Sequence, residues 1–127
     1  MNRLTGKRIL LVEDEVLIAE MVVDMLEGLG ATVIGPATSL ETGLSLAGSE
    51  DIDAAVLDVN LRGKRIDPIA DLLIARGVPV VFATGYGKAA GNAKGRAEAI
   101  DKPYTQDRLA TALLRAMAVP KTAGTNA

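Results

Sequence analysis

The 127-residue chain contains neither cysteine nor histidine. Without cysteine there is no disulfide bond and no thiol nucleophile, and without both residue types there is no zinc site of the Cys/His kind. A histidine general base is excluded in the same way. Any chemistry of this chain must therefore rest on carboxylates, hydroxyls, amides, lysine and arginine.

Aromatic residues are scarce as well. There is no tryptophan, and the aromatic positions are Phe82, Tyr86 and Tyr104. Because 49% of the residues are hydrophobic, the core must be built mostly from aliphatic side chains, and long disordered stretches are not expected. The length suits one domain. We expect it to span residues 1–119, followed by a polar tail over 120–127.

The chain also lacks a strong charge and long apolar runs. Its net charge of −2 gives no reason to expect binding to nucleic acid or to a membrane surface. The apolar runs are too short to span a bilayer, and no charged segment followed by an apolar one opens the chain. We therefore expect a cytoplasmic protein.

Short apolar runs alternate with helical patterns along the sequence. In 54–58, four apolar residues run directly into Asp58, as expected for a strand buried on both faces of a parallel sheet. Pro36 indicates an edge position for one strand. Runs of the same kind predict further strands at 9–12, 32–37, 78–84 and 97–101. The alternation predicts an α/β fold, a doubly wound, five-stranded parallel sheet with helices on both faces.

The predicted helices follow from apolar stripes and capping residues. Asp14 can cap the first helix and Gly30 end it; the pair Thr38 and Glu41 has the form of a capping box. Asp67, which precedes a proline, predicts the start of a third helix, and Thr105 predicts the start of a fourth. The apolar stripes are Ile18, Met21, Val22, Met25, Leu26 and Leu29; Leu40, Leu44 and Ala47, weakened by Gly43; Ile69, Leu72 and Leu73; and Leu109, Ala112, Leu113, Ala116 and Met117.

Side chains that can bind an ion or take part in a reaction lie where four of the predicted strands end. Glu13 and Asp14 follow the first strand, Asp58 and Thr84 close the third and fourth, and Lys102 follows the fifth. Ligands of open α/β sheets bind outside the carboxyl ends of the strands. If the strand order is 2-1-3-4-5, the three carboxylates meet, with the hydroxyl and the ammonium group nearby.

Clustered carboxylates without histidine suit a hard cation such as Mg²⁺. A carboxylate can also accept a phosphoryl group and form an aspartyl phosphate, whose oxygens Thr84 and Lys102 could bind. Simpler readings remain open: Asp14 could only cap a helix, with Glu15 complementing its dipole. Lys102 could be solvated, and the cations Lys88, Lys94 and Arg96 could be a solvated face.

Over nearly its full length the chain resembles the receiver domain of two-component response regulators. The matching motifs are Leu11-Val12-Glu13-Asp14-Glu15, Leu57-Asp58-Val59-Asn60, Thr84-Gly85 and Lys102-Pro103. The resemblance implies a flavodoxin-like (βα)5 fold with strand order 2-1-3-4-5. It further implies a phosphoprotein whose donor is a histidine kinase or phosphotransfer protein and whose downstream partner is an unknown protein.

The resemblance also assigns roles to residues. Asp58 would accept the phosphoryl group, and Mg²⁺ would be held by Asp14, Asp58 and the Asn60 carbonyl, with Glu13 helping through water. Thr84 would bond the phosphate when the domain switches on, and Lys102 would pair with it. The Lys102–Pro103 peptide bond would be cis, which aims the Lys102 side chain at the site.

The sequence departs from the family pattern at three positions. Arg62 stands where a proline is usual, Gly85 where an alanine is usual, and Ala99 in place of an aromatic residue. The motif Phe-Ala-Thr-Gly is similar to that of a variant branch of mostly single-domain receivers, and we expect no output domain after the last helix. Because Ala99 cannot serve as the inward-turning aromatic residue, Tyr86 is our candidate for reading the switch and setting the phosphate lifetime; it could also be an ordinary surface aromatic.

The segment 87–96 carries glycines at 87, 91 and 95 and no large apolar residue. A helix there would be poorly supported. We expect this segment to be the softest internal part of the domain and the part that changes on phosphorylation.

Other functions are possible for this set of residues. An aspartyl-phosphate phosphatase of the haloacid dehalogenase type uses similar groups, but it needs an acid/base carboxylate where Asn60 stands, and its acidic pair follows the nucleophile. A Rossmann nucleotide-binding domain would need glycines where Glu13, Asp14 and Glu15 stand. A receiver that only binds a partner would not need all the site residues. We expect a signalling domain that phosphorylates and dephosphorylates itself, not an enzyme.

Overall fold

The computed structural model describes residues 3–61, 64–84, 97–101 and 104–118. Helices and strands alternate along most of this length. In chain order the elements are β1 (Arg8–Val12), α1 (Val16–Gly28), β2 (Thr32–Ala37), α2 (Leu40–Ser49), β3 (Ala54–Asp58), β4 (Asn60–Leu61), β5 (Lys64–Arg65), α3 (Asp67–Ala75), β6 (Val80–Thr84), β7 (Ala97–Asp101) and α4 (Gln106–Ala118).

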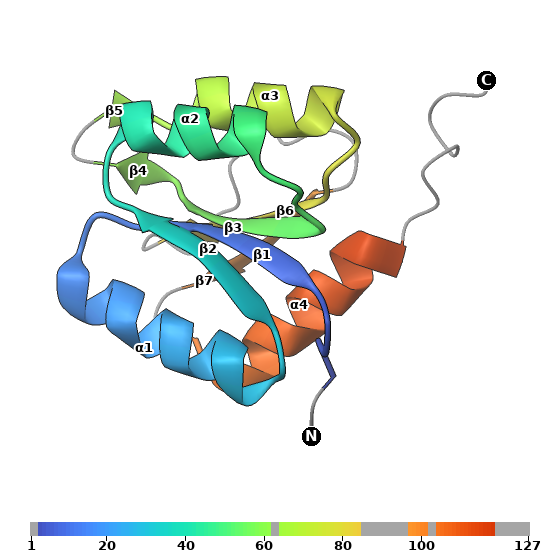
Figure 1. Ribbon diagram of the computed structural model, residues 1–127. Helices are drawn as coiled ribbons and strands as arrows, with labels where there is room; N and C mark the ends of the chain where they lie inside the picture. Colours follow the sequence, from blue (N-terminus) through green and yellow to red (C-terminus); the bar gives the residue numbers. More distant parts are fainter. Residues whose placement is uncertain (1–2, 62–63, 85–96, 102–103, 119–127) are drawn as a thin grey trace.

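Five strands form one parallel sheet in the order β2-β1-β3-β6-β7. Counted in chain order these strands give 2-1-3-4-5, so the predicted order is confirmed. The helices α2 and α3 cover one face of the sheet, and α1 and α4 cover the other (Figure 1). The result is a doubly wound α/β sandwich of three layers. The segment 87–96, with its doubtful helix, lies outside the described residues.

β3 lies at the centre of the sheet, and all five of its residues are buried. β1 pairs with it on one side and β6 on the other. Such a strand meets water on neither edge nor face, which explains its apolar sequence. Asp58 is the exception in this strand, and it lies at the carboxyl end.

β2 is an edge strand, as Pro36 predicted. Its pairing with β1 shifts between Leu10 and Val12. Proline cannot donate a hydrogen bond to a strand ladder, so an irregularity of this kind is tolerated at an edge. The Gly35–Pro36 peptide bond is cis, a feature that the sequence did not predict.

Helix α1 begins one residue later than predicted. Its N-cap is Glu15, without a capping side-chain hydrogen bond, so the interpretation of Asp14 as the helix cap is wrong. Gly30, with φ of +92°, follows the end of the helix as expected. In the apolar stripe Met21 is 51% exposed, whereas Ala19 is buried. The prediction that Met21 belongs to the buried face was therefore wrong.

Helices α2 and α3 also begin one residue from the predicted position. The N-cap of α2 is Ser39 and not Thr38, and its hydroxyl accepts a hydrogen bond from the Thr42 N–H at 3.2 Å. Adjacent hydroxyl residues share the same capping chemistry, so the pattern alone could not choose between them. The N-cap of α3 is Ile66, which makes Asp67 the first helical residue.

Helix α4 begins as predicted. The Thr105 hydroxyl accepts a hydrogen bond from the Arg108 N–H at 3.1 Å, which satisfies one of the open donors of the first turn. The predicted stripe is buried apart from Met117, which is partly buried.

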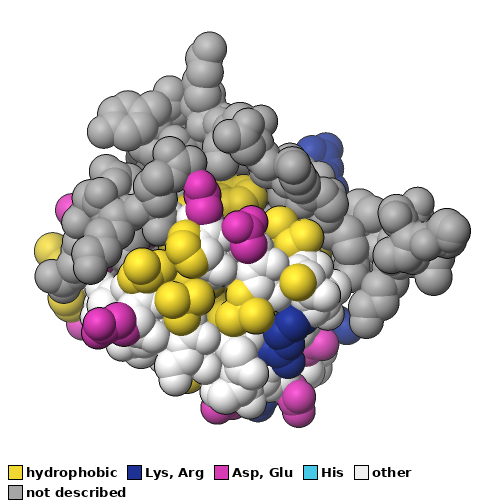
Figure 2. All heavy atoms as spheres, turned by 90° about the horizontal axis from the view of Figure 1, so that it is seen from above, with side chains coloured by type: hydrophobic (Ala, Val, Ile, Leu, Met, Phe, Trp, Pro, Cys, Tyr) yellow, Lys and Arg dark blue, Asp and Glu magenta, His cyan; other side chains and the backbone are white. Residues whose placement is uncertain are grey.

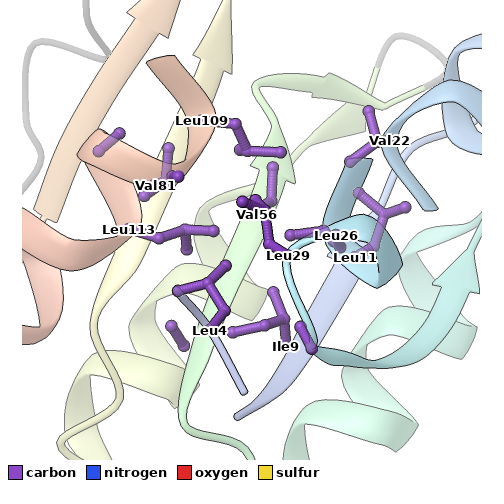
Figure 3. Close-up of a cluster of buried hydrophobic side chains, with 14 of the residues drawn as sticks. Leu4, Ile9, Leu11, Val22, Leu26, Leu29, Val56, Val81, Leu109 and Leu113 are labelled. Carbon is purple, nitrogen blue, oxygen red and sulfur yellow. The ribbon is translucent and has the colours of Figure 1, made fainter. Parts of the chain in front are cut away.

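Each face of the sheet has its own hydrophobic core. The core under α1 and α4 is almost wholly aliphatic (Figure 3). The core under α2 and α3 contains Phe82. There Gly43 is buried, and a Cβ atom added to it would lie 2.5 Å from Cδ1 of Ile69. Gly43, which we expected only to weaken α2, thus allows α2 and α3 to approach closely. Seen from above, hydrophobic side chains gather over these two helices (Figure 2).

The connection between β3 and α3, predicted as a loop, contains two short antiparallel strands. In this pair Asn60 lies opposite Arg65 and Leu61 opposite Lys64. The hairpin starts two residues after Asp58 and therefore leaves the sheet at its carboxyl edge. Two-residue strands leave no sequence pattern that distinguishes them from a loop.

Candidate phosphoacceptor site

The carboxyl ends of four neighbouring strands lie at one edge of the sheet, and the predicted site residues that the structure describes lie there. β1 runs in register with β3, so that Val12 lies beside Leu57. Asp58 lies beside Ala83 of β6, and Thr84 lies beside Asp101 at the end of β7. The strand order thus places the carboxyl ends of β1, β3, β6 and β7 at one edge of the sheet, as the sequence predicted.

Glu13, Asp14 and Asp58 form an acidic cluster, and one carboxylate oxygen from each lies within 4.8 Å of the others. Glu13 is only 2% exposed and Asp58 7%, whereas Asp14 is partly exposed. One oxygen of Glu13 accepts a hydrogen bond from the Glu15 N–H at 3.1 Å. This bond holds the Glu13 side chain against the start of α1.

The cluster has the composition of a site for a hard divalent cation. Carboxylates this close repel one another, and burial strengthens the repulsion. A divalent cation bound among them would relieve that repulsion, and carboxylate oxygens are the ligands that Mg²⁺ takes in proteins.

The remaining predicted residues are described only in part. Asn60 opens β4 and Thr84 closes β6, and their backbones lie at the same edge as Asp58. Lys102 and Pro103 follow β7 but lie outside the described residues, as does Tyr86. The cis Lys102–Pro103 bond and the role of Tyr86 thus stay predictions.

Tyr104, the other tyrosine of the chain, lies close to the cluster. It is 7% exposed. Burial, and after it the charges of Glu13 and Asp58, raise the pKa of its phenol well above the ordinary value. One sequence signal could have found it, since it stands only two residues after Lys102 and directly before the cap of α4.

Helix α1 leaves large apolar side chains exposed beside the cluster. Val16, Leu17 and Met21 are 62%, 76% and 51% exposed, and Val16 is two residues from Asp14. The solvent side of this helix carries acids and no lysine or arginine. A shallow groove next to it is lined by Val16, Ala19, Glu20, Val23, Asp24, Pro36 and Thr38.

None of the helices in the described part of the chain combines the length and apolar character that crossing a membrane requires.

Comparisons with known proteins identify the family of this chain. SdrG from Sphingomonas melonis Fr1 is 40% identical and superposes with a TM-score of 0.76, over 92% of this chain and 99% of SdrG. An NtrX-like response regulator of Rickettsia conorii is 31% identical over 121 residues, which are 89% of this chain. The matched residues make up 25% of that relative, so this chain spans about a quarter of its length.

A second similar structure is the receiver domain of the sensor histidine kinase PA1611 from Pseudomonas aeruginosa PAO1, described with a magnesium ion in its active-site cleft. It is 23% identical, with a TM-score of 0.77 over 89% of this chain and 98% of that domain, and so it supports the fold. The family model of the response regulator receiver domain matches residues 9–114. The chain therefore belongs to the response regulator receiver domains of two-component signalling.

Proposed function

We propose that Asp58 is the phosphoacceptor and that its donor is a phosphohistidine of a histidine kinase or phosphotransfer protein. A carboxylate oxygen of Asp58 attacks the phosphorus atom, so an O–P bond forms while the N–P bond of the phosphohistidine breaks, and the imidazole nitrogen ends protonated. The observation that carries the proposal is the position of Asp58: it ends the central strand, within 4.8 Å of Glu13 and Asp14.

The acidic cluster would hold Mg²⁺ through Asp14 and Asp58, with Glu13 acting through water and the Asn60 carbonyl completing the protein ligands. When bound, the ion would neutralise charge on the cluster and on the incoming phosphoryl oxygens. Thr84 and Lys102 would bind those oxygens as hydroxyl donor and cation. The donor set supports this assignment, since all its members offer oxygen.

Phosphorylation of Asp58 would switch a protein-binding surface, or the domain would pass the group on or store it. In each case the chain acts on its own carboxylate and does not turn over an external substrate. We place this reaction in the cytoplasm and assign residues 1–119 to the receiver domain.

Intact mass spectrometry after incubation with acetyl phosphate and Mg²⁺ tests the proposal. Wild type should gain one phosphoryl group and Asp58→Asn none. Asp71→Asn, which alters an exposed carboxylate on α3, is the matched control and should gain the group as wild type does. A phosphoryl group on Asp58→Asn would show that another residue is the acceptor. The phosphatase alternative would show instead as release of phosphate from external phosphoesters, which we do not expect, and the family match gives it no support.

A further inference from the structure

Tyr104 is fixed in the connection between β7 and α4. It is buried in the core cluster under α1 and α4, which also contains Ala83 and Leu109. The next residue, Thr105, accepts the Arg108 N–H on its hydroxyl at 3.1 Å and the Leu109 N–H on its carbonyl at 3.0 Å. The start of α4 therefore holds the backbone next to Tyr104 in one place.

The Asp58 side chain projects from the face of the sheet on which Tyr104 lies. Asp58 lies in register with Ala83 on the neighbouring parallel strand, and residues in register direct their side chains to the same face of a sheet. Ala83 belongs to the core cluster that contains Tyr104, whereas Leu57 and Phe82, one residue earlier in each strand, belong to the cluster on the opposite face. The tyrosine ring and the Asp58 carboxylate thus share one side of the sheet.

The phenol hydroxyl lies within range of both buried acids. The charges of Glu13 and Asp58 each act on it, in addition to burial, and raise its pKa.

We propose that Tyr104 is a positioning residue of the phosphoacceptor site: on the face of the sheet that carries the Asp58 side chain, its ring closes the α4 side against water. Loss of an acyl phosphate by hydrolysis requires a water molecule beside the phosphorus atom, and a closed, apolar wall reduces that access. Tyr104 then sets the lifetime of the phosphorylated state. This inference rests on the proposed phosphorylation of Asp58 and adds a residue that the family motifs quoted above do not include.

The first test measures phosphate lifetime. Wild type, Tyr104→Phe, Tyr104→Leu and Leu113→Ala are loaded with acetyl phosphate and Mg²⁺, the donor is removed, and the phosphorylated fraction is followed by intact mass. Tyr104→Leu should lose the group about tenfold faster, the change for a barrier lowered by about 1.4 kcal/mol. Tyr104→Phe, which keeps the ring, should restore most of the lifetime. Leu113→Ala, a buried change in the same core, controls for lost stability and should keep the lifetime of wild type.

The second test reads the hydroxyl directly. In the Tyr86→Phe variant Tyr104 is the only tyrosine, and the chain has no tryptophan. Mg²⁺ at the cluster changes the field at the phenol, so tyrosine fluorescence should respond to Mg²⁺, and Asp14→Asn in the same background should abolish the response.

Two results overturn the inference. One is an unchanged lifetime in Tyr104→Leu that still accepts phosphate; the other is fluorescence that ignores Mg²⁺ in a protein that is phosphorylated. If Tyr104→Leu does not fold, the fluorescence result decides. Failure of wild type to accept phosphate would instead contradict the proposed function, because it is measured before any change at Tyr104.

Discussion

The two ends of the parallel sheet differ in how their charged side chains are arranged. At the amino end Arg8 opens β1, and its guanidinium pairs with Glu50 at 3.1 Å and donates to the Asp51 carbonyl at 2.7 Å. Its backbone N–H donates to the Asp53 carboxylate at 2.8 Å. Arg76 donates to the Ala47 carbonyl in the same region. Each of these contacts joins a donor to an acceptor. The Glu50 carboxylate meets the Arg8 guanidinium, and the Asp53 carboxylate meets the Arg8 backbone N–H.

At the carboxyl end like charges gather. Glu13, Asp14 and Asp58 bring three carboxylates within 4.8 Å of one another, two of them buried. Carboxylates this close repel one another, and clusters of this kind are typical of sites that serve binding or catalysis. From this difference we infer that the amino end serves stability and that the carboxyl end serves the proposed chemistry. Changes at the carboxyl end should affect metal and phosphate, while changes at the amino end should affect only the free energy of unfolding.

The largest effect should come from Asp14→Asn. Removing one carboxylate relieves repulsion, so the variant without metal should be at least as stable as wild type. Wild type should gain about 2.7 kcal/mol when Mg²⁺ is at 100 times its Kd, and the variant should gain little. Urea denaturation of both proteins with and without Mg²⁺ measures this. Equal stabilisation by Mg²⁺ in the two proteins would contradict the role of Asp14.

The next effect concerns the exposed apolar end of α1. Leu17 is 76% exposed two residues from the N-cap of the helix, and the helix carries Glu20, Asp24 and Glu27 without a cation. This surface suits a partner helix with an apolar stripe flanked by lysine or arginine, and it borders the site at which a phosphodonor must arrive.

We therefore predict that Leu17→Glu slows phosphorylation by a phosphorylated histidine phosphotransfer protein about 30-fold, the effect of losing about 2 kcal/mol of binding. Phosphorylation by acetyl phosphate should not change. Leu114→Glu on α4, a residue 38% exposed, is the control and should leave both rates unaltered. An equal loss in both variants, or none in either, would remove α1 from the donor interface.

A smaller effect should appear only at high pH. The phenol of Tyr104 ionises near its ordinary pKa of 10.0 in the unfolded chain, whereas burial, Glu13 and Asp58 raise its pKa in the folded state. The stabilisation that this difference provides is complete below pH 10 and is lost as the pH rises above it, by at most about 1.4 kcal/mol per pH unit. Tyr104→Phe should show a shallower decline than wild type in denaturation measured between pH 9 and about 11. If the free energy of unfolding declined equally with pH in the two proteins, the pKa of Tyr104 would not be raised in the folded state.

The fold was predictable because few strand patterns compete with one another. The run 54–58 has one reading, a central strand, and β3 has those bounds. The three carboxylates follow from strand order, which places the ends of β1 and β3 together. These features depend on local hydrophobic pattern and on topology, and both are written in the sequence.

The details that escaped prediction depend on contacts between distant residues. Met21 fits a helical stripe, yet its side chain is 51% exposed among the residues that the structure describes. Gly43 has a packing role only because Ile69 lies against it, and the part proposed for Tyr104 depends on the core cluster that it shares with Ala83 beside Asp58. Pattern reveals which faces are apolar, but not which partner covers them. The predicted softness of 87–96 and the role of Tyr86 concern residues outside the described part and stay predictions, which hydrogen exchange and the phosphate lifetime of Tyr86→Ala can check.

The smallest effect is expected at the amino end. Glu50→Gln removes the carboxylate that pairs with Arg8, and both side chains are 40% exposed. A pair this open to solvent contributes about 0–1 kcal/mol, and Arg8 keeps its hydrogen bonds to the Asp51 carbonyl and, through its backbone, to Asp53. The variant should therefore lose no more than this in urea denaturation, and less at high salt, because salt screens the pair. Its phosphate lifetime and its stabilisation by Mg²⁺ should equal those of wild type. A change in either would mean that the two ends of the sheet are coupled through β1, and the separation of stability from chemistry along this sheet would then be wrong.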